Sequence, residues 1–307
     1  MTAASGPGSL PAPIRATDAD LPASVAAALA SPEEPARLVV DAAGIPYAVA
    51  AWGRPADPPL LLVHGVTASS GIWWRVGPAL AAAGLRVLAI DQPGHGRTGH
   101  WTGHHRFRDN ARDLAAFVGA AGLVPDALSI VGHSWGAMTV AALPAVGLRP
   151  RRMVLLDPPA APHAVMAAMV GSTTDRSYED LAEAILAVGS ENPRWSFEDV
   201  RQKADALVHV DPVAARAILL ENGDWDGGLA DLTDPAAAGI EAWLVRGDPD
   251  AGGLVPDEAL PALAAAVGPD HVLTIAGGAH APQRLLPEAT TLALLRALGA
   301  DAGRSRG

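Results

Sequence analysis

Short apolar runs rich in β-branched residues alternate with longer Ala- and Leu-rich stretches along most of this chain of 307 residues. Strands that alternate with helices form a mostly parallel sheet covered by helices, so the pattern predicts an α/β fold. Strands are predicted over residues 37–40, 47–51, 60–63, 86–90, 128–131 and 153–156. Helices are predicted over residues 71–83, 107–121 and 135–146, each ending near a glycine that can cap it.

The strand pattern stops after residue 157 and resumes near residue 240. The residues between read as helices alone, with helix starts indicated at Ser177, Ser196 and Asp211. Strands are then predicted over 241–246 and 271–275, and helices over 257–267 and 287–298. We therefore expect a core formed by residues 36–159 and 240–300, a helical cap (a lid) inserted at 160–239, and a flexible leader over 1–35 with at most one short helix near 23–30.

The composition narrows the classes of function. The chain has no cysteine, which excludes disulfides, thiolate nucleophiles and cysteine-held metal sites. It carries 22 basic and 33 acidic residues, a formal net charge of −11. A surface of that sign repels nucleic acid and anionic lipid, so neither is expected as a partner. Residues 1–20 contain no basic segment followed by an apolar one, as an export signal has, so a cytoplasmic location is expected.

One pentapeptide has the residue pattern of a turn that presents a nucleophilic serine. Gly132, Ser134 and Gly136 match the Gly-x-Ser-x-Gly pattern where the strand over 128–131 meets the next helix. A serine on such a sharp turn is held in a strained conformation that exposes its hydroxyl, and the glycines leave room where strand and helix come close. The first N–H groups of the helix point above the serine, so the Trp135 N–H is a candidate donor to an oxyanion. The glycines also favour a buried strand and helix over a membrane span in the uncharged stretch 127–148.

In this context the sequence resembles the alpha/beta-hydrolase superfamily over about residues 37–299. Residues 61–65, Leu-Leu-Val-His-Gly, look like the family's segment after its third strand, and residues 91–96, Asp-Gln-Pro-Gly-His-Gly, resemble the turn after the next strand. The resemblance implies the serine-nucleophile branch with a helical cap, a mostly parallel central sheet flanked by helices, and no cofactor. It also implies that Val66 supplies a second oxyanion N–H beside that of Trp135.

A serine hydroxyl needs a base to take its proton and a carboxylate to orient that base. The resemblance assigns the base to His280, which follows the last predicted strand, although relatives often have glycine where Ala279 stands. The segment Gly-Asp-Pro-Asp at 247–250 resembles the family's Gly-x-x-Asp and makes Asp250 the first choice for the acid. Asp157, at the end of the strand before the insertion, and Asp248 stay open as alternatives.

The chain has eight tryptophans against three Phe and two Tyr. Trp74 follows the expected oxyanion loop, Trp135 flanks the serine, and Trp195 lies in the insertion that would cover the site. We expect these side chains and His133 to line an apolar pocket for a hydrophobic or aryl acyl group, although core packing explains any one tryptophan equally well.

The other histidines suggest no metal site. His100, His104 and His105 lie close in sequence, but no acid or cysteine at ligand spacing completes a metal site, and we interpret them as solvated loop residues. His64 and His95 lie in the two family turns, where a hydrogen bond that fixes the loop is expected.

These observations predict a serine carboxylic-ester hydrolase that cleaves an ester or lactone of a small hydrophobic or aryl substrate through an acyl-enzyme on Ser134. A serine at this position argues against the family's epoxide and haloalkane hydrolases, which go through an aspartyl ester. Open alternatives on the same fold are a carbon–carbon bond hydrolase, an amide or peptide hydrolase similar to the proline iminopeptidases, and a cofactor-free perhydrolase. A ligand-binding receptor is the non-catalytic alternative. The oligomeric state is not predicted.

Overall fold

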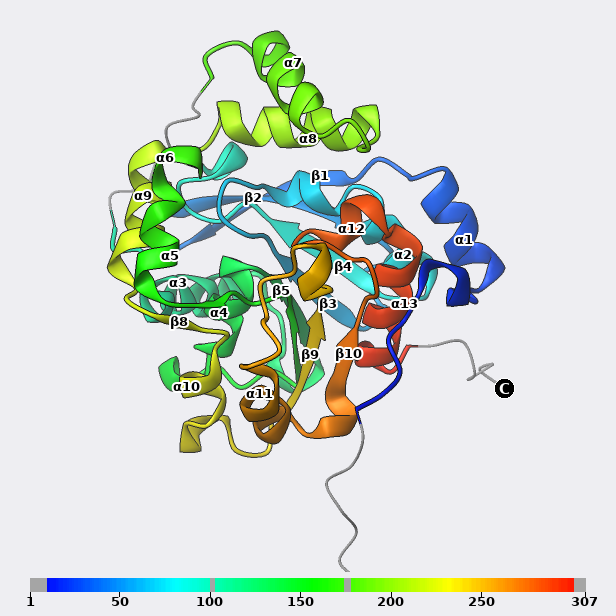
Figure 1. Cartoon of the computed structure of the whole chain (residues 1–307), viewed down its shortest axis with the longest axis vertical. Coiled ribbons are helices and arrows are strands. Elements are labelled where there is room, and N and C mark those ends of the chain that lie inside the picture. Colours follow the sequence, from blue (N-terminus) through cyan, green and yellow to red (C-terminus); the bar gives the residue numbers. More distant parts are fainter. Residues whose placement is uncertain (1–9, 100–102, 174–177, 301–307) are drawn as a thin grey trace, which may run out of the picture.

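The computed structural model describes residues 10–99, 103–173 and 178–300. Its centre is an eight-stranded sheet in the order β1-β2-β4-β3-β5-β6-β9-β10 (Figure 1). β2 runs antiparallel to both β1 and β4, and the remaining neighbours are parallel. The strands are β1 (Ala36–Ala42), β2 (Ile45–Trp52), β3 (Pro59–Val63), β4 (Arg86–Ile90), β5 (Ser129–His133), β6 (Arg152–Leu156), β9 (Glu241–Arg246) and β10 (Val272–Thr274). The mostly parallel sheet is confirmed, and strand ends differ from the prediction by at most two residues.

Neighbouring residues along the strands supply two separate apolar layers. Leu60 and Leu62 of β3 pack on the side of α1, α2 and α13. Leu61 and Val63 pack on the opposite side, with α3 and α4. Because both faces are buried, each central strand must be apolar at nearly every position, as the sequence is. The helices that cover the two faces are α1 (Ala23–Ala30), α2 (Val76–Ala82), α3 (Phe107–Ala120), α4 (Trp135–Ala141), α11 (Leu260–Val267) and α13 (Pro287–Leu298).

The short helix predicted near residues 23–30 is observed as α1, but the described part of the N-terminal segment is packed, so the prediction of a flexible leader is corrected for residues 10–35. The Ile14 N–H donates to the Thr274 carbonyl at 2.8 Å, and the Ile14 carbonyl accepts from the Ala276 N–H at 2.9 Å. Val25 of α1 is fully buried in the same apolar layer as α2 and α13. The buried apolar residues of this segment, Ile14, Val25 and Leu29, are too few to show a periodic pattern, although each fills a place in that layer.

The insertion between β6 and β9 is mainly helical where the structure describes it. It also contains a two-stranded antiparallel sheet of β7 (Ala160–Ala161) and β8 (Trp225–Asp226). In Figure 1, α7 and α8 lie side by side at the top of the view, and α5, α6 and α9 form a second group. The helices are α5 (His163–Ala168), α6 (Val170–Thr173), α7 (Leu181–Glu191), α8 (Phe197–Val208), α9 (Pro212–Glu221) and α10 (Leu229–Leu232).

Two of the three predicted helix starts in the insertion are observed. The Ser196 hydroxyl accepts from the Asp199 N–H at 3.1 Å and caps α8, and Asp211 caps α9 before Pro212. Ser177 lies outside the described residues, and the cap of α7 is Asp180, which accepts from the Glu183 N–H at 2.9 Å. In the ranges described, none of the helices has both the length and the apolar character needed to cross a bilayer.

Candidate active site

Ser134 stands between β5 and α4 in a backbone conformation that L-residues rarely adopt, with φ of +56° and ψ of −124°. The tightness of the turn explains its glycines. A Cβ on Gly132 would collide with the Gly136 carbonyl, and a Cβ on Gly136 would lie 2.5 Å from the carbonyl oxygen of His64. Ser134 is therefore held in a strained conformation by close packing of strand against helix, as the sequence pattern predicts.

His280 lies between Ser134 and a buried acid. Its Nε2 is 2.8 Å from the Ser134 Oγ, and its Nδ1 is 2.7 Å from Oδ2 of Asp157. A carboxylate only accepts hydrogen bonds, so Nδ1 carries the proton and Nε2 accepts from the serine hydroxyl. In this tautomer His280 is prepared to take the serine proton.

Asp157 follows β6 and is fully buried. Its Oδ1 accepts from the Gly247 N–H at 2.9 Å, and its Oδ2 accepts from the Leu254 N–H at 2.9 Å in addition to His280. Asp157 itself has a φ of +44°. Three donors compensate for the lost hydration of the buried carboxylate and fix its direction toward His280.

The structure places Asp250 elsewhere, and the first choice for the acid is corrected. Asp250 lies on an exposed short 3-10 helix, Pro249–Ala251, and its backbone N–H donates to Oδ1 of Asp248 at 3.1 Å. The second alternative, Asp248, uses its other oxygen to accept from the Gly277 N–H at 2.8 Å. Asp248 thus caps one loop and ties it to the loop that carries His280, and the acid that contacts His280 is Asp157.

The segment after β3 lies directly against Ser134. A Cβ on Gly65 would lie 2.8 Å from the Cβ of Ser134, so only glycine lets this segment approach so closely. Within the described residues, neither the Val66 nor the Trp135 backbone N–H has an acceptor inside the chain. Both therefore stay available to a bound oxygen. The His64 Nδ1 donates to the Gly65 carbonyl at 2.7 Å, and its Nε2 accepts from the Gln92 N–H at 2.9 Å, which fixes this segment.

A lysine of the insertion holds the next residue of the same segment. The Lys203 Nζ of α8 donates to the Thr67 carbonyl at 2.7 Å and to the Thr67 Oγ1 at 2.8 Å. Thr67 has a φ of +54°, which a β-branched residue adopts only when its surroundings impose it. Lys203 is the only lysine of the chain, whose other 21 basic residues are arginines. This rarity is the one sequence signal that could have identified it.

Three buried histidines near the site are neutral. Burial lowers the pKa of His64 to about 4 and that of His95 to about 3, and it holds the pKa of His133 well below its ordinary value. The His133 Nε2 donates to the His280 carbonyl at 2.7 Å, with the two rings 4.9 Å apart. A neutral His133 supports the backbone of His280 without repelling a protonated imidazole.

A cavity of about 460 Å³ opens beside Ser134 and His280. Of the four expected pocket residues, His133 and Trp195 line it. Trp135 is instead fully buried in an apolar cluster with Met138 and Ile218, and the Trp74 indole donates to Oδ1 of Asp199 at 2.9 Å. The apolar lining comes largely from side chains that the sequence did not single out, namely Ile72, Met166, Met169, Leu219, Leu254 and Leu285.

The cavity is mostly apolar, as expected, but charged side chains, which the sequence did not predict, also line it. They are Glu191, Arg194, Lys203 and Arg284. Arg284 lies on α12 (Pro282–Leu285), four residues after His280, and its side chain is 3% exposed. No local pattern marks Arg284 in the sequence, since burial of an arginine depends on the tertiary contacts.

The prediction that the clustered histidines are solvated loop residues holds for one of the two that the structure describes. His104 is exposed, as expected of a loop residue, whereas His105 is 4% exposed, and burial lowers its pKa. His100 lies outside the described residues. Over the described ranges, no group of three or more His, Asp or Glu side chains is arranged to hold a metal ion.

Comparisons with known proteins agree with this architecture. A family model for the alpha/beta hydrolase fold matches residues 58–193. The chain is 34% identical over 132 residues to epoxide hydrolase A of Mycobacterium tuberculosis, covering 42% of this chain and 41% of the relative. It is 37% identical over 82 residues to esterase PIR7B of Oryza sativa subsp. japonica, covering 26% of this chain and 31% of the relative. The aligned parts thus span less than half the length of these curated relatives.

Two solved structures are similar over nearly their whole length. E-2-(acetamidomethylene)succinate hydrolase has a TM-score of 0.73 at 22% identity, covering 86% of this chain and 99% of that chain. The esterase RhEst1 from Rhodococcus sp. ECU1013 has a TM-score of 0.66 at 20% identity, covering 88% of this chain and 100% of that chain. Together with the family model and the sheet order, they show that this chain has the alpha/beta hydrolase fold.

Proposed function

We propose that this chain is a serine hydrolase that cleaves a carboxylic ester or lactone through an acyl-enzyme on Ser134. The observation that carries the proposal is the continuous relay from the Ser134 Oγ through His280 to Asp157, with distances of 2.8 and 2.7 Å. The relay opens on a cavity large enough for a small acyl group and its leaving alcohol.

In the first half-reaction the Ser134 Oγ attacks the ester carbonyl while its proton passes to Nε2 of His280. Asp157 keeps the imidazole oriented and stabilises it when it is protonated. The developing oxyanion accepts from the N–H groups of Val66 and Trp135, and His280 then gives its proton to the departing alcohol. In the second half-reaction His280 takes a proton from water, the hydroxide attacks the acyl-enzyme, and Ser134 regains its proton as the acid leaves.

The relatives named epoxide hydrolase do not point to the same reaction here. The aspartyl-ester route needs a carboxylate at the turn after β5, and this chain has Ser134 there. A serine hydroxyl activated by histidine suits acyl transfer, for which the relative named esterase is the closer guide. We therefore propose the ester or lactone reaction ahead of epoxide opening.

A fluorophosphonate probe with mass mapping of the adduct tests the proposal, followed by turnover of p-nitrophenyl acetate and butyrate. We expect one adduct, on Ser134, and loss of both labelling and turnover in Ser134→Ala. Thermal unfolding at the wild-type temperature would show that the variant is folded. Stoichiometric binding of esters without turnover would contradict the proposal and favour a receptor.

A further inference from the structure

The cavity beside Ser134 carries positive charge in a chain whose formal net charge is −11. Arg194, Lys203 and Arg284 line the cavity from three different segments, and Glu191 is the acid among its described lining residues. Arg194 and Glu191 are exposed and therefore strongly solvated, Lys203 is half-buried, and Arg284 is buried. Of these four charged side chains, Arg284 therefore interacts most strongly with a charged group in the cavity, because a buried charge is screened least.

Arg284 has few partners for a buried guanidinium. Its Nη1 donates to the Asp199 backbone carbonyl at 2.8 Å and lies 3.8 Å from Oδ1 of Asp199. Its guanidinium carbon lies 4.5 Å from the centroid of the Trp195 ring, and Trp195 also lines the cavity. A guanidinium has five N–H groups, and the backbone carbonyl engages one of them. The geometry leaves the rest of this planar donor set beside the cavity.

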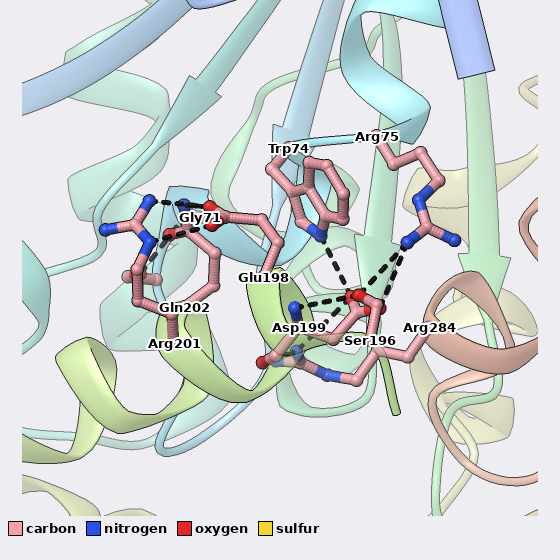
Figure 2. A network of polar contacts seen from close by, with 10 residues as sticks. Gly71, Trp74, Arg75, Ser196, Glu198, Asp199, Arg201, Gln202 and Arg284 are labelled. Atoms are coloured by element: carbon pink, nitrogen blue, oxygen red, sulfur yellow. Dashed lines mark hydrogen bonds and ion pairs between the residues drawn. The ribbon is translucent and has the colours of Figure 1, made fainter. Parts of the chain in front are cut away.

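Among the described residues, the carboxylate paired with Arg284 is that of Asp199, and several donors share it (Figure 2). Asp199 Oδ2 accepts from the Ser196 hydroxyl at 2.6 Å and pairs with Nη2 of Arg75 at 3.4 Å. Asp199 Oδ1 accepts from the Trp74 indole at 2.9 Å. One buried carboxylate thus serves two guanidinium groups, so the charged cluster of Arg75, Asp199 and Arg284 has a net charge of +1. Burial lowers the pKa of Arg284 to about 10, which still leaves it charged near neutral pH.

We propose that Arg284 binds a carboxylate on the acyl part of the substrate, so that the preferred substrates are half-esters of short dicarboxylic acids. The inference rests on the proposed function of Ser134. A carboxylate matches the guanidinium fork and compensates a buried charge whose present partners are incomplete. Arg284 follows His280 by four residues and both line the same cavity, so one acyl chain can reach from one to the other. The ammonium of Lys203 adds to the attraction for an anion.

A purely structural role for Arg284 is the competing explanation, since it links α12 to α8 through Asp199. Such a role predicts that changing Arg284 alters stability and the turnover of all esters by the same factor. Binding of a carboxylate predicts a change in preference between charged and neutral substrates. The ratio of kcat/KM for a half-ester to that for a neutral ester of equal length separates the two.

The experiment compares monomethyl succinate with methyl butyrate, which differ by a carboxylate in place of a methyl group, and follows methanol release. We expect wild-type protein to favour the half-ester by tenfold or more, and Arg284→Met to lose that preference. Arg284→Lys should keep part of it. Arg296→Met, on the exposed side of α13, is the matched control and should keep the wild-type ratio. The preference of the wild-type protein should also shrink as salt is raised.

Binding to Ser134→Ala protein keeps the inference testable without turnover and covers a poorly folding Arg284 variant. Calorimetry should show monomethyl succinate binding at least tenfold more tightly than methyl butyrate. Equal affinities, or an unchanged kcat/KM ratio in a folded Arg284→Met protein, would overturn the proposal. Turnover of neutral esters without preference for half-esters would refute this inference alone, whereas absence of probe labelling at Ser134 would refute the proposed function.

Discussion

The relay of Ser134, His280 and Asp157 and the charged cluster of Arg75, Asp199 and Arg284 differ in how completely their polar groups are paired. Asp157 accepts three hydrogen bonds, and both ring nitrogens of His280 have partners. In the charged cluster a single carboxylate faces two guanidinium groups. This difference suits the relay and the charged cluster to two different tasks. The relay is complete before any ligand arrives, as catalysis by preorganised groups requires, and the charged cluster becomes complete only with an anion.

The largest effect on activity is expected from a change of Asp157, the acid of the relay. In Asp157→Asn the side chain can no longer hold the Nδ1–H tautomer of His280, so we expect kcat to fall by about 10³- to 10⁴-fold. The matched control is Asp250→Asn, which changes an exposed acid and should leave kcat within about twofold. Steady-state rates with p-nitrophenyl butyrate measure both. Equal losses in the two variants would show that the relay is assigned to the wrong acid.

The second prediction concerns the charged cluster. Asp199→Asn leaves two guanidinium groups without their carboxylate, and we expect the free energy of unfolding to fall by about 3 kcal/mol. Asp109→Asn removes the carboxylate of an exposed pair with Arg112 and should cost below about 1 kcal/mol. Urea unfolding followed by tryptophan fluorescence measures both. A loss for Asp199→Asn no larger than that of the control would mean that the cluster contributes nothing to stability.

A third prediction tests the neutral histidines around the relay. The pKa values of His64 and His95 are about 4 and about 3 when folded and rise to about 6.5 in the unfolded chain. Below pH 6.5 the unfolded chain binds protons that the folded protein does not, so stability is lost as the pH falls. Each residue should contribute a slope of about 1.4 kcal/mol per pH unit between pH 4 and 6.5.

Urea unfolding at pH 7 and pH 5.5 measures that slope. His95→Gln should reduce it by one residue's share, and His104→Gln, which changes an exposed histidine, should leave it unchanged. The same slope in all three proteins would mean that His95 is not held neutral by burial.

The smallest effect is expected where Lys203 of the insertion contacts Thr67, in the segment beside Ser134. Lys203→Met keeps the length of the side chain but loses both hydrogen bonds to Thr67, so the Val66 N–H is held less firmly. We expect kcat for a neutral ester to fall by about five- to tenfold, less than the loss of an oxyanion donor, with little change in KM. Arg201→Met, on the same helix and paired with Glu198, is the control. A change in KM alone would assign Lys203 to substrate binding only.

The strands and the serine turn could be predicted because their causes are local. A central strand must be apolar on both faces, and the turn around Ser134 needs glycine at positions 132 and 136, so both leave a pattern in adjacent residues. His280 is found in the same way, because it follows the last strand directly. The packed segment over residues 10–35 was missed because a few isolated apolar side chains hold it.

The acid could not be chosen from the sequence, and the reason is the sheet itself. β6 and β9 are parallel neighbours with Leu156 opposite Val245, so the residues after both strands lie at the same edge. The position in the sheet alone therefore does not distinguish Asp157 from Asp248 as the acid. Their different roles follow from the N–H groups that each carboxylate meets: those of Gly247 and Leu254 orient Asp157 toward His280, and those of Asp250 and Gly277 hold Asp248 away.

The charges in the cavity were missed for a related reason. Lys203 and Arg284 are 81 positions apart in a chain with many basic residues, and only the folding of the insertion onto the core brings them to one cavity.

The single lysine has a practical consequence for anyone who attaches this protein to a surface or a dye. Reagents that react with primary amines find one side-chain target, and it holds the Thr67 turn beside the nucleophile. Acylation of Lys203 would remove its charge and disturb the geometry on which turnover depends. Immobilisation through carboxyl groups, which are abundant on this acidic chain, avoids that damage.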